Sequence, residues 1–599
     1  MCGIIGYIGD KNAVPILIEG LKKLEYRGYD SCGICVVKNG KLVILKERGK
    51  ISKLEEKKEL RNMKGNIGIG HTRWATHGQP SKTNAHPHLD CKREIAIVHN
   101  GIIENYQSLK KMLEGEGHKI ISETDSEIIV HLIEKFYSQD LREAVVKAIK
   151  LVEGAFGLVI ICKNEEKLIA ARKGSPLVIG IGKNGMFISS DVPAILKYTR
   201  KVIYLKDNEV AEIEKNSYSV KKLDGKEIDK KIHRIKWSIN QIEKGNFKHF
   251  TLKEIFEQPK AIKDTLRGRL KNGKIKLSLK LDINSTKRII ITACGTSWHA
   301  GLIGKCLIEK ITRIPVEVDY ASEFRYRNPL INKNDLVIVI SQSGETADTL
   351  AALQEAKFKR AKTLGIVNVV GSTISREVDS GIYLHSGPEI GVASTKAFTS
   401  QIVALLLFAL FLNQERNIKL DKEILKELEF LPLKIERILK KSDEIRETAE
   451  KFKDSGNFLY LGRGINFPVA LEGALKLKEL SYVPAQGYPA GEMKHGPIAL
   501  VDKNITVIFV APKDRIFKKV LNNMEEIKTR KGKIIAVTDK KDEKLNELTD
   551  ALIRVPRAKE EISPILNVIP LQLFAYYVAD LKKIDVDKPR NLAKSVTVE

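Results

Sequence analysis

Apolar residues in the first part of the chain follow two periods, one typical of helices and one typical of strands. Residues 13–24 carry apolar side chains at the spacing of an amphipathic helix. Residues 32–37 and 41–45 flank an Asn-Gly pair, which predicts a β-hairpin. Short apolar runs at 66–72 and 94–99 predict two further buried strands. Strands outnumber helices in this region, which predicts an α+β domain.

The second half of the chain repeats one strand–helix unit twice. Strands predicted at 288–292 and 458–461 each precede a polar turn and a helix. A second pair of strands, at 335–340 and 505–510, follows in the same order. This alternation predicts two α/β domains with parallel sheets. The polar stretch 241–248 is predicted to link them to the first domain.

Composition and charge narrow the class of protein. A chain of 599 residues with 43% hydrophobic content has room for about three or four domains with their own cores. Its net charge of +27 comes from lysines and arginines that alternate with glutamates and form no basic block with aromatics. An anionic metabolite is therefore a better-supported partner than nucleic acid.

Apolar stretches, targeting signals and the number of cysteines indicate where in the cell the protein is located. The longest uncharged apolar stretch, 402–412, is short for a membrane span and reads as a buried helix. No signal peptide precedes Cys2. Seven cysteines, few and odd in number, suit a reducing environment. We therefore expect a cytoplasmic protein that does not interact with membranes.

Cys2 is the first candidate catalytic residue. Removal of Met1 would place a thiol nucleophile and a free α-amine on one residue. An α-amine has an unperturbed pKa of about 7.7–8.0 and suits a general base at neutral pH. The alternative is a small residue that opens a buried strand. Cys32 and Cys35 form a C-x-x-C pair without a second pair, which favours core packing over redox or zinc chemistry.

Polar residues after the predicted strands offer further chemistry. Five histidines lie between His71 and His99, but no helical spacing or cysteine pair gives ligand geometry, so no metal site is predicted. Asn100 and Gly101 offer an amide and a backbone N–H at a strand end, as an oxyanion hole requires, although a plain Asn-Gly turn has the same sequence. Asp125 opens a helix, where it would either hold a substrate ammonium or cap the helix.

Hydroxyl-rich turns in the first repeat indicate an anion site. Thr296 and Ser297 follow one predicted strand, and the turn 341–346 follows the next. Hydroxyls and backbone N–H groups at helix starts bind phosphate, and α/β sheets bind ligands at the carboxyl ends of their strands. The second repeat lacks these hydroxyls, and the Walker signature is absent.

Five motifs of the first domain occur in a characteristic order and spacing: Cys2-Gly3-Ile4, Tyr26–Ser31, His71–Gly78, His99–Gly101 and Glu123–Asp125. In this the domain resembles the class II glutamine amidotransferases, which are N-terminal-nucleophile hydrolases with an αββα sandwich. It implies that Cys2 attacks the glutamine amide, releases ammonia and leaves a γ-glutamyl thioester for water to hydrolyse. Asn100 and Gly101 would stabilise the oxyanion. The residues implied to bind glutamine are Arg73 at its α-carboxylate, Asp125 at its α-amine, Trp74 as a hydrophobic plug, Thr76 and His77.

The two repeats resemble sugar isomerase (SIS) domains, which are doubly wound. The full chain resembles the family of isomerising glutamine:fructose-6-phosphate aminotransferases, on the motifs 389–396, 476–481, 491–497 and the tail 587–599. The implied organisation is an amidotransferase domain at 2–240, a linker at 241–248, SIS domains at 249–422 and 423–588, and a tail at 589–599.

The same resemblance implies how fructose 6-phosphate would become glucosamine 6-phosphate, without a cofactor. Lys594 would form a Schiff base at C2, and Glu479 would move a proton from C1 to C2. His495, helped by Lys476, would open the sugar ring. The residues implied to bind the sugar phosphate are Thr296, Ser297, Ser341, Gln342, Ser343, Thr346 and Ser394. Ammonia would cross a dry passage between the sites, and a homodimer is implied because SIS sites commonly take a residue from a neighbouring subunit.

Two alternative functions stay open. One is a different glutamine-dependent transferase with another sugar-phosphate acceptor. Phosphoribosyl transfer is disfavoured because no acidic run lies within an apolar strand. The other is a non-catalytic SIS module that senses a sugar phosphate, against which the presence of Lys594, Glu479 and His495 argues.

Overall fold

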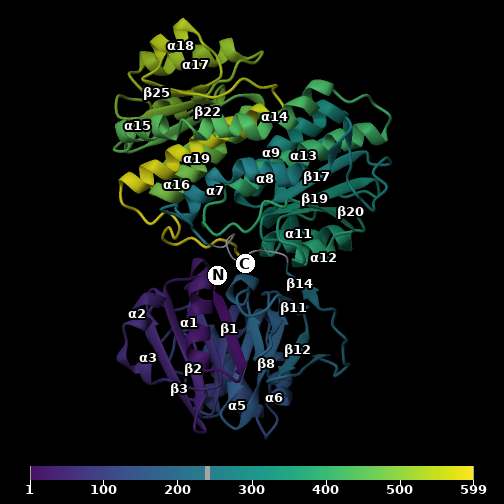
Figure 1. Ribbon diagram of the computed structural model, residues 1–599, viewed down its shortest axis with the longest axis vertical. Helices are drawn as coiled ribbons and strands as arrows, with labels where there is room; N and C mark the ends of the chain where they lie inside the picture. Colours follow the sequence, from purple (N-terminus) through teal and green to yellow (C-terminus); the bar gives the residue numbers. More distant parts are fainter. Residues whose placement is uncertain (1, 236–242, 598–599) are drawn as a thin grey trace. The chain divides into compact units, whose positions relative to one another are not determined.

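The computed structural model of the protein describes residues 2–235 and 243–597. Met1, the first two residues of the predicted linker and the last two residues of the predicted tail lie outside these ranges. The chain forms two compact units, one of Met1–Ile242 with Ala593–Glu599 and the other of Glu243–Leu592 (Figure 1). The bounds predicted for the two SIS domains stay predictions, because both repeats lie within the second unit.

Unit 1 contains two antiparallel sheets. The first has eight strands in the order β14-β11-β9-β10-β1-β4-β2-β3, and the second has six in the order β13-β12-β8-β7-β6-β5. The first sheet consists of β1 (Gly3–Gly9), β2 (Ser31–Lys38), β3 (Lys41–Arg48), β4 (Ile67–Arg73), β9 (Val178–Ile181), β10 (Gly185–Ser189), β11 (Lys201–Tyr204) and β14 (His233–Arg234). The second consists of β5 (His88–Leu89), β6 (Ile95–Ile103), β7 (Gly154–Cys162), β8 (Glu165–Lys173), β12 (Glu209–Ile213) and β13 (Tyr218–Lys222).

Helices cover the outer face of each sheet. Helix α1 (Ala13–Leu24) packs on β1 and β4, whereas α4 (Tyr106–Gly115), α5 (Asp125–Phe136) and α6 (Leu141–Ile149) form the layer over the second sheet. Strand β6 shows how this layering follows from the period of two: Ala96 and Val98 pack between the sheets, whereas Ile95 and Ile97 face the helices. The predicted helix, hairpin and αββα sandwich are confirmed.

One strand boundary differs from the prediction. We expected the strand to end at His99, with Asn100 and Gly101 beyond it, but β6 continues to Ile103 because β7 pairs with it as far as Gly154. Gly101 has a φ of +142°, and a Cβ atom there would lie 1.9 Å from the carbonyl oxygen of Ala155. The glycine is therefore needed for the approach of β7, in addition to any role in the site.

Unit 2 contains two parallel five-stranded sheets with the same topology. Their orders are β18-β17-β19-β20-β21 and β23-β22-β24-β25-β26, so the second strand of each copy lies at the edge beside the first. The first copy consists of β17 (Arg288–Ala293), β18 (Val316–Tyr320), β19 (Asp335–Ser341), β20 (Lys362–Val367) and β21 (Ser380–Tyr383). The second consists of β22 (Phe458–Gly462), β23 (Ala485–Pro489), β24 (Thr506–Val510), β25 (Lys533–Thr538) and β26 (Ala551–Arg554). The predicted repeat and its parallel sheets are confirmed.

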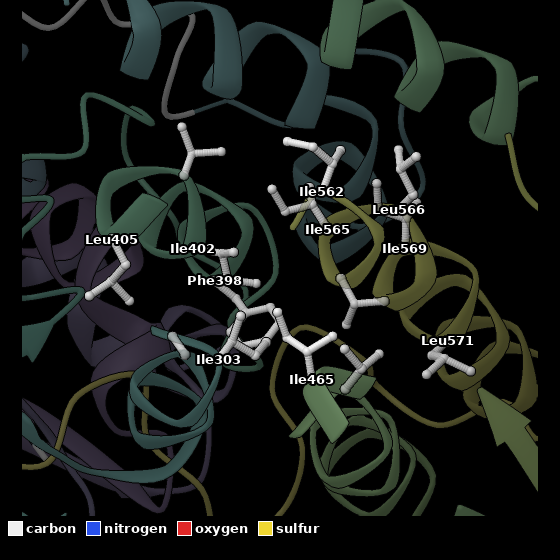
Figure 2. Close-up of a cluster of buried hydrophobic side chains, with 14 of the residues drawn as sticks. Ile303, Phe398, Ile402, Leu405, Ile465, Ile562, Ile565, Leu566, Ile569 and Leu571 are labelled. Carbon is white, nitrogen blue, oxygen red and sulfur yellow. The ribbon is translucent and has the colours of Figure 1, made fainter. Parts of the chain in front are cut away.

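The two repeats share one hydrophobic core. Ile303 of α9 (Gly295–Thr312) and Phe398 of α13 (Lys396–Glu415) belong to the first repeat. They lie in the same buried cluster as Ile465 and as Ile569 of α19 (Ser563–Leu581), which belong to the second (Figure 2). This shared core explains why the repeats form one compact unit.

Helices α13 and α19 are long and apolar enough to cross a membrane by length and composition. In each, 89% of the most apolar window is buried inside the protein, as in the core helices of a folded domain. The apolar stretch 402–412 lies within α13, which is 20 residues long and so exceeds the predicted segment.

Candidate active sites

Cys2 lies directly before β1, beside the end of β4. Gly3 pairs with Thr72, so Cys2 comes next to the Arg73-Trp74 segment. Its Sγ accepts a hydrogen bond from the Trp74 N–H at 3.3 Å. Burial raises the pKa of the Cys2 thiol, and the Trp74 N–H and the charge of Arg73 oppose this increase. Attack by sulfur therefore needs a base close by, which the α-amine of a processed Cys2 would supply.

Asn100 connects the nucleophile to a buried histidine. Its Nδ2 donates to the carbonyl oxygen of Cys2 at 3.0 Å, and its Oδ1 lies 3.1 Å from Nε2 of His71. His71 Nε2 also lies 3.0 Å from the carbonyl oxygen of His99, so this nitrogen must carry the proton and donate. Burial lowers the pKa of His71 to about 3, which keeps the ring neutral. We did not assign His71 a role from the sequence, where it was one of the five clustered histidines and the first residue of the stretch 71–78.

Arg73 presents an unused donor. Its Nη2 donates to the carbonyl oxygens of His77 and Gly78, whereas Nη1 is buried without a hydrogen-bond partner in the described part of the chain. Burial also lowers the pKa of Arg73. A buried guanidinium with a free N–H suits a ligand carboxylate, because such a pair forms charge-assisted hydrogen bonds.

Asp125 is a buried carboxylate at the start of α5. The helix is capped by Thr124, whose side chain accepts from the Glu127 N–H, so the alternative that Asp125 caps the helix is wrong. Instead, Asp125 Oδ2 accepts from the Ile103 N–H at 2.9 Å, and Oδ1 accepts from Ser126 Oγ at 3.2 Å. Together with Arg73, this carboxylate offers the opposite charges that the α-amine and α-carboxylate of an amino acid require.

The remaining predicted glutamine-binding residues lie in the loop after β4. Trp74 is half-buried and Thr76 is exposed. His77 packs edge-on against Tyr106, with ring centroids 5.2 Å apart, and its Nδ1 lies 3.3 Å from Thr76 Oγ1. The loop brings these side chains next to Arg73 in sequence, and their contact with substrate stays a prediction.

Three of the clustered histidines pack on one another. The rings of His71 and His86 stack at 4.1 Å, and the rings of His86 and His88 meet edge-on at 4.6 Å. Burial lowers the pKa of both His86 and His88 well below the usual value. These are neutral, buried rings, which favours the architectural interpretation of this stretch.

The hydroxyl-rich turns of the first repeat lie at the carboxyl ends of adjacent strands. Strand order reverses between β17 and β19, which is the switch point where doubly wound sheets bind ligands. Thr296 and Ser297 lie in the first turn of α9, after β17. The turn 341–346 connects β19 to α11 (Ala347–Phe358). The structure therefore brings the two predicted anion-binding turns to one edge of one sheet.

Hydrogen bonds organise the second turn. Ser341 Oγ lies 2.9 Å from Thr346 Oγ1 and accepts from the Gly344 N–H at 3.0 Å. Ser343 Oγ accepts from the Glu345 N–H at 3.1 Å. Gln342 lies in the same turn and is half-buried.

Ser297 and Ser394 have partners of their own. Ser297 Oγ accepts from Gln401 Nε2 at 2.9 Å. Ser394 lies in the turn before α13 and donates to Glu389 Oε2 at 2.9 Å. Their contact with a sugar phosphate stays a prediction, as it does for the residues of the turn 341–346.

A buried polar network joins the two repeats. Lys476, on α16 (Phe467–Ser481), donates from Nζ to Glu479 Oε2 at 2.5 Å and to Thr296 Oγ1 at 3.1 Å, and lies 3.4 Å from Glu472 Oε1. Glu472 is fully buried, and it accepts from Thr296 Oγ1 at 3.1 Å. Its other oxygen lies 2.7 Å from His299 Nδ1.

The network explains the charge state of Lys476. Burial alone would lower the pKa of Lys476, but the carboxylates of Glu472 and Glu479 raise it above the usual value. Lys476 is therefore a cation held between two carboxylates. The hydroxyl of Thr296 is engaged on both sides, so phosphate binding through it would have to displace one of these bonds. We missed Glu472 and His299 in the sequence, although Glu472, Lys476 and Glu479 follow the spacing of one helix face.

His495 and Lys594 come from two other segments of the chain. His495 is exposed after the 3-10 turn Glu492–Lys494, and its N–H donates to the Glu492 carbonyl oxygen at 2.9 Å. Lys594 is half-buried in the segment Ala593–Glu599, which belongs to unit 1. The roles assigned to both residues stay predictions.

Known proteins are similar to this chain over its whole length. The protein-family model described as "Glutamine amidotransferase domain" matches residues 71–197, and the family model described as "SIS domain" matches residues 282–411 and 451–581. Two relatives, from Chlorobaculum tepidum and Aquifex aeolicus, are named glutamine–fructose-6-phosphate aminotransferase (isomerizing). They are 54% and 51% identical to this chain, over 100% of both chains in each case.

A solved structure matches the second half. The C-terminal domain of glucosamine-fructose-6-phosphate aminotransferase from Francisella tularensis is 42% identical, with a TM-score of 0.55. The match covers 58% of this chain and 100% of that one. With one amidotransferase domain and two SIS domains, the chain therefore belongs to the family of isomerising glutamine–fructose-6-phosphate aminotransferases.

Proposed function

We propose that the protein converts glutamine and fructose 6-phosphate into glutamate and glucosamine 6-phosphate. The observation that carries this proposal is the presence of two different sets of polar residues in one chain. One set provides a nucleophile, an amide donor and opposite charges for an amino acid. The other provides hydroxyls at a sheet switch point beside a buried lysine–carboxylate network. The names of relatives that match over their full length support the same reaction.

The first half-reaction begins at Cys2. Arg73 holds the α-carboxylate of glutamine and Asp125 its α-amine, which directs the side-chain amide toward the sulfur. The thiolate adds to the amide carbon, and the oxyanion that forms is stabilised by Asn100 Nδ2 and the Gly101 N–H. Ammonia leaves with a proton from the α-amine of Cys2, and water then hydrolyses the thioester to glutamate.

The second half-reaction takes place at the sugar phosphate. Lys594 forms a Schiff base with C2 of the open-chain ketose, and ammonia displaces it. Glu479 removes a proton from C1 and returns it to C2, which gives the 2-amino aldose. Lys476 orients the Glu479 carboxylate for this transfer, because the two groups form an ion pair at 2.5 Å. His495 opens the ring of the incoming sugar.

The two half-reactions balance. Glutamine and water give glutamate and ammonia, and ammonia with fructose 6-phosphate gives glucosamine 6-phosphate and water. Direct passage of ammonia between the sites avoids its dilution and protonation in solvent. We further propose a homodimer located in the cytoplasm, which light scattering of the purified protein and fractionation of the source cells would test.

An assay of both products with purified protein tests the proposed function. With glutamine and fructose 6-phosphate together, we expect glutamate and glucosamine 6-phosphate in equal amounts. Glutamate without glucosamine 6-phosphate would indicate another acceptor. Binding of fructose 6-phosphate without either product would indicate the sensor alternative.

A further inference from the structure

A cluster of four side chains in unit 1 lies apart from the residues assigned to glutamine. Cys91 follows β5, His118 follows α4, and His131 and Glu134 lie three residues apart on α5. Each side chain contributes one ligand atom, and the four atoms lie within 4.8 Å of one another. This set could not be predicted from the sequence, because its members span 44 residues and only the last two share a regular spacing.

Four of the distances between these atoms are close to those of a tetrahedral metal site. Cys91 Sγ lies 3.5 Å from His131 Nδ1 and 3.9 Å from His118 Nδ1. Glu134 Oε2 lies 3.1 Å from His118 Nδ1 and 3.3 Å from His131 Nδ1. The bond lengths of tetrahedral Zn²⁺ require about 3.6 Å between sulfur and nitrogen ligands and about 3.3 Å between nitrogen and oxygen ligands. Four of the six ligand–ligand distances are therefore within about 0.3 Å of those expected around one central Zn²⁺ ion.

A second layer of contacts orients the ligands. His131 Nε2 lies 3.6 Å from Glu127 Oε1, on the side of the ring away from the cluster. Glu127 is itself fixed by the N–H groups of Ile121 and Ser122. The 3.6 Å separation is an ion-pair contact and is too long for a hydrogen bond. A carboxylate at this nitrogen is nevertheless the partner that metal-binding histidines usually have. Cys91 Sγ also accepts a hydrogen bond from the Lys119 N–H at 3.4 Å, which helps to fix the position of the sulfur.

An ion can reach the cluster from solvent. Cys91 is exposed, and it is the one exposed cysteine of the seven. A cavity of about 440 Å³ opens beside it, and Cys91, Glu127 and His131 are among its lining residues. The deeper ligand, His131, is 1% exposed. The site is thus open to solvent at Cys91 and closed to solvent at His131.

We propose that Cys91, His118, His131 and Glu134 bind one Zn²⁺ ion. The set of one sulfur, two imidazole nitrogens and one carboxylate oxygen suits zinc, whereas Mg²⁺ and Ca²⁺ prefer oxygen ligands. All four positions are supplied by protein, which is the pattern of a structural site rather than a catalytic one.

The ion would tie three segments of unit 1 together. It joins the turn after β5 and the turn after α4 to the carboxyl-terminal half of α5. Asp125, at the other end of α5, lies nine residues before Glu134, or about 13 Å along the helix axis. Zinc is therefore expected to stabilise the amidotransferase unit without taking part in glutamine hydrolysis.

Cobalt substitution in the full-length protein tests the geometry. After treatment with a chelator, we expect one equivalent of Co²⁺ to produce the visible bands of tetrahedral cobalt and a near-ultraviolet sulfur-to-cobalt band. Cys91→Ser should lose the sulfur band, and His118→Ala the tetrahedral spectrum. Cys306→Ser, a cysteine in unit 2, is the matched control and should keep both. Glu127→Gln should weaken binding by about 10- to 100-fold.

Alkylation of the wild-type protein provides a second test that does not depend on folding of the variants. Zn²⁺ should protect Cys91 from iodoacetamide, as peptide mass spectrometry would show, and a chelator should restore its reactivity. Mg²⁺ should give no protection. Equal alkylation of Cys91 with and without Zn²⁺, or a cobalt spectrum that Cys91→Ser leaves unchanged, would overturn the proposal.

Discussion

The side-chain amide of Asn100 donates a hydrogen bond to the backbone carbonyl oxygen of Cys2 at 3.0 Å. The proposed oxyanion donor and the proposed nucleophile are therefore fixed to each other before substrate arrives. Because Asn100 lies on β6 and Cys2 precedes β1, this bond also spans the two sheets of the sandwich. Pre-organisation of this kind avoids the cost of reorienting donors during the reaction.

Substitution of the two proposed covalent residues should separate the half-reactions. Cys2→Ala is expected to lower glutamate release by at least about 10³-fold, because the nucleophile is gone. Lys594→Ala should abolish glucosamine 6-phosphate formation and leave glutamate release intact. Lys594→Arg, which keeps the charge but forms no Schiff base, should behave like Lys594→Ala. Loss of glutamate release in Lys594→Ala would argue against two separable sites.

His71 is expected to act as a positioning residue through Asn100. Without the Nε2 donor, the Asn100 amide is held only by its bond to the Cys2 carbonyl oxygen and is less firmly oriented. His71→Ala should therefore lower kcat for glutamine hydrolysis by up to about 100-fold, the lower end of the cost of losing an oxyanion donor. The KM for glutamine should change little, since no contact with substrate is removed. His71→Gln retains an N–H near the same position and should recover part of the rate. A rise in KM with unchanged kcat would contradict this role.

Gly101 should tolerate no side chain. Its φ of +142° and the 1.9 Å approach of Ala155 predict that Gly101→Ala destabilises unit 1 by about 1–3 kcal/mol or more and abolishes glutamate release. Gly115→Ala is the matched control, because nothing lies within 4 Å of its added Cβ. Urea unfolding of both variants, followed by hydrogen exchange in unit 1, checks the difference. Equal stability of the two variants would show that β7 can move away from Gly101.

Glu472 should be essential for the stability of unit 2. Glu472→Ala leaves Lys476 with one carboxylate and His299 without its partner, which is expected to cost about 3–5 kcal/mol. Lys478→Ala, at an exposed position of the same helix, should change stability by no more than about 0.5 kcal/mol. Glucosamine 6-phosphate formation should fall in Glu472→Ala, while glutamate release persists. A fully stable Glu472→Ala variant would show that the network contributes nothing to folding.

The buried histidine His71 predicts how stability depends on pH. Its pKa of about 3 in the folded protein lies below the ordinary value of 6.5, so between these values the unfolded chain binds the extra proton. The free energy of unfolding should therefore rise from pH 3 to pH 6.5, with a contribution from His71 of up to about 5 kcal/mol. Denaturant titrations over this range should show a smaller increase in His71→Gln. An identical pH dependence in the variant would mean that the folded ring takes up a proton.

Local patterns in the sequence were sufficient for most elements and for the architecture. The Asn-Gly pair at 39 and 40 marked the hairpin, and repeated buried strands marked the two parallel sheets, because period and turn chemistry are local properties. The end of β6 could not be predicted in this way. Its continuation past His99 depends on pairing with β7, more than 50 residues later.

The polar residues that the sequence did not reveal acquire their meaning from tertiary contacts. His71 matters because Asn100 lies against it, and Glu472 because His299 and Thr296 approach from the other repeat. The four candidate zinc ligands also depend on tertiary contacts, since no regular sequence spacing connects Cys91 to His118. Resemblance to a family identified the residues that share its motifs, and the structure added those that support them.

The common core of the two repeats makes each half depend on the other for folding. A chain cut near residue 422 would leave Ile303 and Phe398 facing solvent on one fragment, and Ile569 on the other. Neither fragment is expected to persist as a monomer, although each carries a complete five-stranded sheet. The two repeats should therefore unfold in a single cooperative thermal transition. A core mutation that destabilises one repeat should also lower the stability of the other.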